Sequence, residues 1–204
     1  MYTPSHYKVV DPQAVRSFIK RHGFGALVSF KDSLHVTHLP FVVEEGEPLA
    51  LSSHMARANP HWRAFAENPE ALVIFQGPHA YISPALYEDR ISVPTWNYAV
   101  VHAYGRVRLD DDVEAVLEKM IRAFDADYLA QWSELPEEYK SKLKAGIVGF
   151  ELEVERVEAK FKMHQGKSRA DRLRIIEEFG ASGDTTLAGV AEYMRLSLSS
   201  EGET

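Results

Sequence analysis

The sequence contains no cysteine. This absence excludes disulfides, thiolate nucleophiles and thiolate metal ligands, so a metal site would need histidine or carboxylate ligands. The sequence also lacks an apolar run of roughly 18 residues, which a membrane-spanning helix needs. Residues 1–6 contain neither the basic nor the apolar segment of a signal peptide. We therefore expect a cytoplasmic protein.

The motifs of several common enzyme classes are missing as well. The sequence has no Gly-x-Ser-x-Gly nucleophile elbow, no glycine-rich dinucleotide fingerprint and no P-loop. Among the nine histidines, His35 and His38 lie three apart on an expected strand and would point to opposite faces. No helical histidine pair with metal-ligand spacing occurs. Neither a metal site nor a nucleophilic serine is predicted.

A surplus of positive charge is also absent, because the formal net charge is −7. Duplex binding depends on clustered Lys and Arg side chains that neutralise phosphates. The composition therefore argues against a broad nucleic-acid-binding face. The run from Lys167 to Arg174, with Arg169 and Arg172, is the local basic candidate. The same run is typical of a solvated helix face.

The sequence does have enough apolar residues for a core, since 45% of its 204 residues are hydrophobic. Apolar alternation and continuous apolar runs predict strands over residues 25–30, 34–43, 49–53, 71–75, 80–83, 98–109 and 147–163. Helical spacing and helix-end signals predict helices over residues 12–23, 60–67, 112–128, 136–145, 168–180 and 184–198.

Two local signals refine this pattern. Gly77-Pro78 predicts a turn between two strands, and a shift of the apolar phase at Glu155-Arg156 predicts a bulge or corner in the last strand. The elements indicate an α+β protein, a small closed or split β-barrel with peripheral helices. We expect a barrel domain over residues 1–165 and a C-terminal helical extension over residues 166–204.

The loop over residues 54–62, with the sequence HMARANPHW, is rich in hydrogen-bond donors. Asn59 is in the position of a helix N-cap, and Pro60 is in the position of the first helical residue. Free N–H groups at a helix N-terminus favour an anion such as phosphate, and Arg57 would add a charged planar fork. The alternative is an ordinary helix cap beside a surface arginine.

Three further segments are unusual, residues 36–40, 75–84 and 93–98, and the last two combine aromatic rings, amides and prolines. Such segments can supply a flat apolar wall together with hydrogen bonds in its plane. A planar heteroaromatic ligand needs both. In the alternative reading, Tyr81, Trp96 and Tyr98 form barrel core and Pro94 marks the start of a strand.

These segments resemble the PaiB family of FMN-binding negative transcriptional regulators. The resemblance covers nearly the whole chain, to about residue 180, and its most specific parts are HMARANPHW (54–62), FQGPHAYISP (75–84) and VPTWNY (93–98), followed by AGIVGFE (145–151) and KFKMHQ (160–165). It implies a split β-barrel of the pyridoxamine-phosphate-oxidase type, usually a homodimer with FMN bound at the subunit interface. Family members are linked to repression of sporulation and protease-production genes in bacilli.

The resemblance implies cofactor contacts for specific residues. Those near the FMN phosphate would be His54, Ala56, Arg57 and Asn59. Those near the ring or the ribityl chain would be Thr37, His38 and Leu39. The neighbouring strand or the other subunit would add Thr95, Trp96, Asn97 and Tyr98, and Gln165 would contribute after the last strand. Similar sequences read Lys-Leu-Ser-Gln-Asn there, so the resemblance includes Lys162, Gln165 and Lys167 but not Met163, His164 and Gly166.

Three classes of function follow from these expectations. The first is a flavin-binding regulator that acts through DNA or a regulatory protein partner, with direct sequence-specific DNA reading the weaker route. The second is a flavin-dependent oxidoreductase, because such a barrel also holds enzymes whose cofactor carries the chemistry. The third is a haem-handling protein with His38, His54 or His164 as axial ligand.

Overall fold

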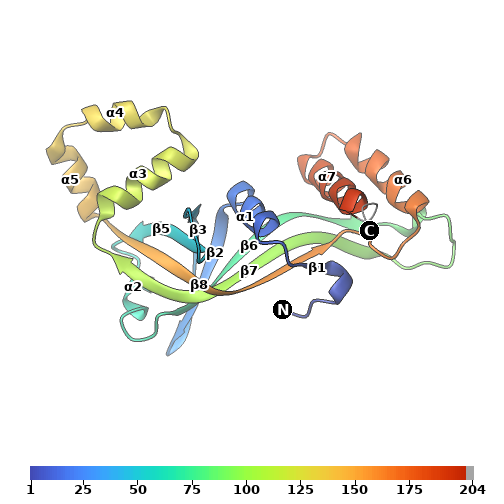
Figure 1. Cartoon of the computed structure of the whole chain (residues 1–204), viewed down its shortest axis with the longest axis horizontal. Coiled ribbons are helices and arrows are strands. Elements are labelled where there is room, and N and C mark those ends of the chain that lie inside the picture. The colour runs from blue at the N-terminus through green and yellow to red at the C-terminus, as the bar shows by residue number, and fades with distance from the viewer. Residues whose placement is uncertain (201–204) are drawn as a thin grey trace. The chain divides into compact units, whose positions relative to one another are not determined.

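The computed structural model describes residues 1–200 and shows an α+β protein built on one antiparallel sheet (Figure 1). The strands are β1 (Lys8–Val9), β2 (Phe24–Lys31), β3 (Ser33–Pro40), β4 (Val42–Val43), β5 (Ala50–Ala56), β6 (Glu70–Ile82), β7 (Thr95–Asp110) and β8 (Ile147–Lys162). Their order is β3-β2-β6-β7-β8-β5-β4, with β1 paired to β8. The sheet therefore has free ends at β3 and β4, as a split barrel has.

Seven α-helices and two short 3₁₀ helices connect the described strands. They are η1 (Ser5–Tyr7), α1 (Pro12–Arg21), α2 (His61–Ala64), η2 (Pro84–Leu86), α3 (Val113–Phe124), α4 (Tyr128–Glu134), α5 (Glu137–Ala145), α6 (Arg169–Gly180) and α7 (Thr185–Ser200). No helix within residues 1–200 is long and apolar enough to cross a membrane.

The chain forms two compact units, and the long strands β6, β7 and β8 contribute residues to both. Unit 1 consists of residues 1–15, 76–101 and 158 onward, and unit 2 consists of residues 16–75 and 102–157. The expected division into residues 1–165 and 166–204 is a different one and stays a prediction.

Unit 2 contains the curled part of the sheet and its core. Strands β2 and β3 form a hairpin, and β5 pairs with β8 from Ala50↔Glu153 to Ala56↔Ile147. Ser53 Oγ on β5 donates a hydrogen bond of 2.7 Å to the Pro40 carbonyl at the end of β3, so the sheet curls until these two strands meet. The enclosed core includes three phenylalanines in edge-to-face contact: Phe41, Phe75 and Phe150.

Unit 1 contains the remaining parts of the three long strands and the paired helices α6 and α7 (Figure 1). Alternating residues of these strands are buried, among them Ala80, Ile82, Ala99 and Ala159. Phe161 on β8 meets Tyr193 on α7 edge to face, with ring centroids 5.4 Å apart. We call this buried side the inner face of unit 1.

Most predicted elements are confirmed, but four details differ. The turn predicted at Gly77-Pro78 is wrong, because β6 runs unbroken from Glu70 to Ile82. Strand β2 pairs with β6 only over Ala71–Ile74, so Pro78 lies beyond that pairing, where a missing N–H is tolerated. The predicted strand 34–43 is divided at Phe41, the predicted helix 60–67 shrinks to α2, and α4 was not predicted.

The predicted change of phase in β8 is confirmed by its burial pattern. Val148, Phe150 and Leu152 are buried in unit 2, whereas Ala159 is buried in unit 1. Between them, Glu155 and Arg156 are both exposed, although successive strand residues normally alternate. The shift therefore lies next to the boundary between the two units.

Candidate functional site

The loop after β5 is tied to strands β2 and β3 through one buried histidine. His61 Nε2 lies 2.8 Å from Ser29 Oγ, and His61 Nδ1 lies 2.8 Å from Thr37 Oγ1. Asn59 Nδ2 donates to the same Thr37 hydroxyl at 3.1 Å, and Asn59 Oδ1 accepts from the His61 backbone N–H. This His61 network fixes Thr37 and Asn59 side by side.

The His61 network works with a neutral imidazole. Burial lowers the pKa of His61 to about 4, and the stacked ring of His35, whose centroid is 5.4 Å away, contributes to the lowering. Ser29 and His61 do not form a catalytic nucleophile–base pair. Both residues are buried, and the second imidazole nitrogen is hydrogen-bonded to a hydroxyl, where a catalytic triad has a carboxylate. The role of this contact is to position the loop.

The anion site predicted at a helix N-terminus has little support from the helix itself, although Asn59 Oδ1 does accept from the His61 N–H at the start of α2. Helix α2 has only four residues, and its N-cap position is Pro60, which has no side-chain cap. So short a helix has little macrodipole. Arg57 donates from Nε to the Ala145 carbonyl at 2.9 Å and from Nη2 to the Ile147 carbonyl at 2.8 Å. Arg57 therefore anchors the loop to the start of β8, and its contact with an anion stays a prediction.

The other predicted residues of unit 2 have different surroundings. His38 is exposed and stacks on Phe24 with ring centroids 6.3 Å apart, whereas Leu39 is buried. His54 Nδ1 lies 3.0 Å from Met120 Sδ, and burial lowers the pKa of His54. Ala56 is exposed at the end of β5. Strand alternation puts His38 on the opposite side from Thr37 and Leu39, so the three residues do not form one surface.

Unit 1 carries a second group of candidate residues on the side opposite its inner face. Aromatic and cationic side chains alternate there with the buried residues of the three long strands. We call this the aromatic–lysine face, and it consists of His79 and Tyr81 on β6, Trp96 and Tyr98 on β7, and Lys160 and Lys162 on β8.

Exposed rings dominate the β6–β7 side of the aromatic–lysine face. Trp96 is 51% exposed and Tyr81 is 50% exposed. The Trp96 ring centroid lies 5.7 Å from that of His79 and 6.2 Å from that of Tyr81, which it meets edge to face. A large indole left half exposed beside two other rings is an apolar surface suited to a planar ligand.

Two lysines occupy the β8 side of the aromatic–lysine face. Lys160 is buried, its Nζ lies 5.2 Å from the centre of the Tyr98 ring, and it donates to the Tyr2 carbonyl at 3.1 Å. Lys162 Nζ donates to Thr95 Oγ1. Burial lowers the pKa of Lys162, Tyr98 partly offsets this, and the nearby Lys160 adds to the lowering. Neither lysine forms an ion pair with a carboxylate within residues 1–200.

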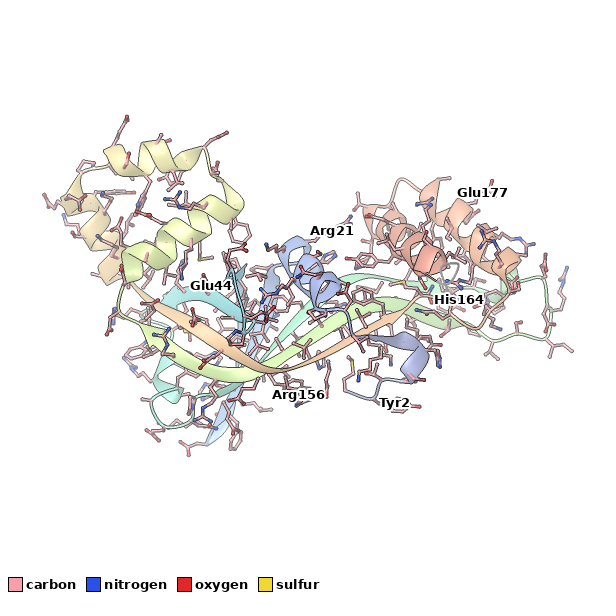
Figure 2. All side chains as sticks on the ribbon, viewed as in Figure 1. Tyr2, Arg21, Glu44, Arg156, His164 and Glu177 are labelled. Carbon is pink, nitrogen blue, oxygen red and sulfur yellow. The ribbon has the colours of Figure 1, made fainter. Side chains whose placement is uncertain are left out.

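Asn97 does not belong to the exposed face, contrary to its predicted contact with a ligand. It is fully buried, its Oδ1 lies 3.0 Å from His164 Nδ1, and its Nδ2 lies 3.4 Å from Met194 Sδ. Figure 2 shows His164 close to the paired helices α6 and α7. Strand alternation explains the difference, because Asn97 points to the inner face while Trp96 and Tyr98 point away from it.

Gln165 closes the turn after β8 with its own side chain. Its Nε2 donates to the Phe161 carbonyl and its Oε1 accepts from the Met163 N–H, each at 2.7 Å. Both ends of the amide are thus used locally, and its predicted contact with the cofactor has no support from this geometry.

Sequence reasoning did not single out His61, His79 or Lys160, and it named Tyr81 and Lys162 only separately, not as parts of one face. His79 and Tyr81 lie within the segment 75–84, but the expected turn at Gly77-Pro78 concealed their alternation. The alternation along β7 and β8 indicates which of their residues share a side of the sheet. Only the strand order shows that the lysines of β8 lie beside the rings of β7.

The comparisons with known proteins agree with this architecture. A family model described as "Putative FMN-binding domain" matches residues 1–156. A curated Bacillus subtilis (strain 168) protein, "Protease synthase and sporulation protein PAI 2", is 35% identical and aligns with 95% of this chain and 96% of its own length. An uncharacterized protein of Emericella nidulans is 30% identical over 78% of this chain and 80% of its own length.

Two solved structures share the fold at low sequence identity. The FAD and heme binding protein of Mycobacterium smegmatis has a TM-score of 0.63 and 13% identity, and the match covers 82% of this chain and 78% of that one. A 5-nitroimidazole antibiotic resistance protein, so described for Bacteroides thetaiotaomicron, has a TM-score of 0.56 and 14% identity over 75% of this chain and 85% of that one. The expected split-barrel fold is confirmed.

Proposed function

The chain belongs to the family described as "Putative FMN-binding domain", and from this premise we propose that it is an FMN-binding protein and a regulator like the Bacillus subtilis relative. Bound FMN supplies a planar ring that can take up and release electrons. The aromatic–lysine face is the observation that carries this proposal, because it exposes the rings of Trp96 and Tyr81 on the same strands as two lysines without a carboxylate partner among residues 1–200.

The described residues fit such a cofactor. Trp96 and Tyr98 offer ring faces for stacking on one side of β7. In unit 2, Thr37 and Asn59 are held by the His61 network and Arg57 is anchored at the end of the loop. The phosphate contact that the family resemblance implies for the loop over residues 54–59 concerns unit 2 alone and is a separate proposal.

The basic residues of helix α6 do not support direct binding of DNA, so the proposed regulation takes another route. Arg172 in the basic run is 2% exposed, and Arg174 donates to the Leu86 carbonyl and pairs with Glu88. The run is therefore not a free basic surface of the kind that binds phosphates. We propose that the flavin-bound protein acts on sporulation and protease-production genes through a regulatory protein partner, in the cytoplasm.

We also propose that the protein is a homodimer with FMN at the interface, as the family resemblance implies. Its support is an exposed apolar surface on the β2–β3 hairpin of unit 2. Phe24, Phe30, Leu34 and Val36 are each more than half exposed there, and β3 is an end strand of the sheet. A contiguous exposed apolar surface on an edge strand is typical of a surface that another chain covers.

Titration of the purified protein with FMN tests the cofactor assignment. We expect saturable binding that Trp96→Ala weakens by about tenfold or more, because the exposed stacking surface is lost. Tyr139→Ala is the matched control, since Tyr139 on α5 is 53% exposed and outside the proposed site. A folded wild type that binds no FMN would contradict the assignment. Steady turnover of NAD(P)H by the loaded protein would favour the oxidoreductase alternative.

A further inference from the structure

Unit 2 contains a cavity that the proposed FMN binding does not use. The cavity lies between helix α3, the last turn of α1 and the segment that includes β4, and its volume is about 440 Å³. All of its lining residues belong to unit 2, and they lie outside the loop over residues 54–59. The volume is within the range of roughly 300–1,000 Å³ that small-molecule sites have.

One wall of the cavity is apolar. Phe41 and Val43 line it and are buried, with 2% and 6% of their surface exposed. Phe124, the last residue of α3, lines the same cavity and is 56% exposed. Apolar side chains of this kind can cover the body of an organic ligand.

Charged side chains line the rest of the cavity, and two of them hold each other. Lys119 Nζ on α3 lies 2.8 Å from Oε1 of Glu44, the residue after β4 that Figure 2 labels. The same carboxylate oxygen accepts a hydrogen bond from Ser52 Oγ. The side chains of Lys119 and Glu44 are only 37% and 20% exposed, so this pair stays together and its charges compensate each other.

Two other cations of the lining are held weakly. Lys20 Nζ lies 3.4 Å from Glu45 Oε1, and these side chains are 57% and 93% exposed. Arg122 Nη2 lies 3.4 Å from Oε2 of Glu118, which is not a lining residue. Exposed ion pairs contribute little free energy, so both cations can leave their partners for a ligand at small cost. The lining has three cations against two carboxylates, which gives the cavity a surplus of positive charge.

An apolar wall beside a surplus of positive charge fits a ligand with an apolar body and one acidic group. We propose that the cavity binds a small organic acid of this class. Phe41, Val43 and Phe124 contact its apolar body. Lys20 and Arg122 bind its acidic group, and the planar N–H fork of the arginine matches the oxygens of a carboxylate or sulfonate. The proposal does not depend on FMN binding.

Fluorescence titration with 8-anilinonaphthalene-1-sulfonate, an aromatic anion, tests the proposal, and uncharged N-phenyl-1-naphthylamine is the comparison. We expect the wild type to bind both probes saturably. Replacement of Lys20 and Arg122 together by methionine should weaken the anionic probe about tenfold, the effect of losing a charge-assisted contact, and leave the neutral probe nearly unchanged. The matched control replaces Lys142 and Arg63, two exposed cations outside the cavity, and should change neither constant.

Ala123→Trp gives a second test that does not depend on charge. Ala123 lines the cavity and is exposed, so an indole there occupies the cavity without entering the core, and it should weaken both probes. Ala126→Trp adds the same ring at an exposed position outside the lining and is the control. Circular dichroism shows that each variant is folded.

Three outcomes would overturn the proposal. Undiminished binding of both probes by folded Ala123→Trp would place them elsewhere on the protein. Equal weakening of the anionic and neutral probes in the double methionine variant, or no weakening of either, would show that the two cations do not recognise an acidic group. A wild type that does not bind the anionic probe would exclude the site, whatever its affinity for FMN.

Discussion

His61 Nδ1 lies 2.8 Å from Thr37 Oγ1, so a histidine of the loop after β5 fixes a hydroxyl on β3. The other imidazole nitrogen lies 2.8 Å from Ser29 Oγ on β2. The two contacts join segments that are 24 and 32 residues apart in the sequence. The loop proposed to bind the FMN phosphate is therefore held by the same strands that form the barrel wall.

His61→Ala should destabilise the folded protein by about 3 kcal/mol. The substitution removes a buried ring and leaves the hydroxyls of Ser29 and Thr37 without their partner. Urea unfolding followed by circular dichroism measures the change. Substitution of the exposed His6 by alanine is the control and should have little effect. A His61→Ala protein as stable as the wild type would show that the network does not hold the loop.

Stability should fall as the pH is lowered from about 6.5 to about 4. Burial lowers the pKa of His61 and of His164 from 6.5 to about 4, and the positive charges of Lys167 and Lys162 contribute at His164. Between these pH values the unfolded chain binds more protons than the folded one, so acid favours unfolding. The two neutral histidines contribute fully to stability above pH 6.5, the unfolded-state pKa. This contribution is lost as the pH falls to about 4, the folded-state pKa.

Unfolding free energies measured across this range check the pH dependence. His61→Gln keeps hydrogen-bonding groups but cannot titrate, so its stability should depend less steeply on pH than that of the wild type. Parallel curves for the two proteins would mean that His61 is not the titrating group.

Gly105→Ala should destabilise unit 2 by about 3 kcal/mol, because strands β7 and β8 approach closely there. A Cβ atom at Gly105 would lie 2.0 Å from the Glu153 carbonyl oxygen. Because that oxygen belongs to the backbone, a change of side-chain rotamer cannot remove the clash. Gly183→Ala is the matched control, since no atom lies within 4 Å of the Cβ position there. Equal thermal stability of the two variants would contradict the close approach of these strands.

Val36→Asp should convert the proposed dimer into a monomer. Val36 is 56% exposed on the end strand β3, and a buried carboxylate without a partner would oppose association. Leu143→Asp on α5 introduces the same charge at an exposed apolar residue outside the hairpin and should leave the dimer intact. Sedimentation velocity distinguishes the two states. A monomeric wild type, or a dimeric Val36→Asp variant, would exclude this surface as the interface.

The sequence predicted much of the fold because its local patterns are strong. The alternation from Tyr98 to Leu109 and the phase shift at Glu155-Arg156 both correspond to observed features of β7 and β8. The failure at Gly77-Pro78 has a physical cause. A Gly-Pro pair usually ends a strand, and only the position of Pro78 beyond the pairing with β2 makes it tolerable.

The candidate site was harder to predict because its geometry depends on neighbouring strands. Asn97 and Trp96 are adjacent in the sequence, but one is fully buried and the other is half exposed. Arg57 is the residue type that often binds anions, but two of its N–H groups donate to backbone carbonyl oxygens near the start of β8. Residue type alone could not distinguish a side chain that supports a site from one that lines it.

A crystal structure of the FMN complex tests the central claim most directly. We expect the flavin ring against Trp96 or Tyr98. A flavin that contacts none of the six residues of the aromatic–lysine face would contradict the account.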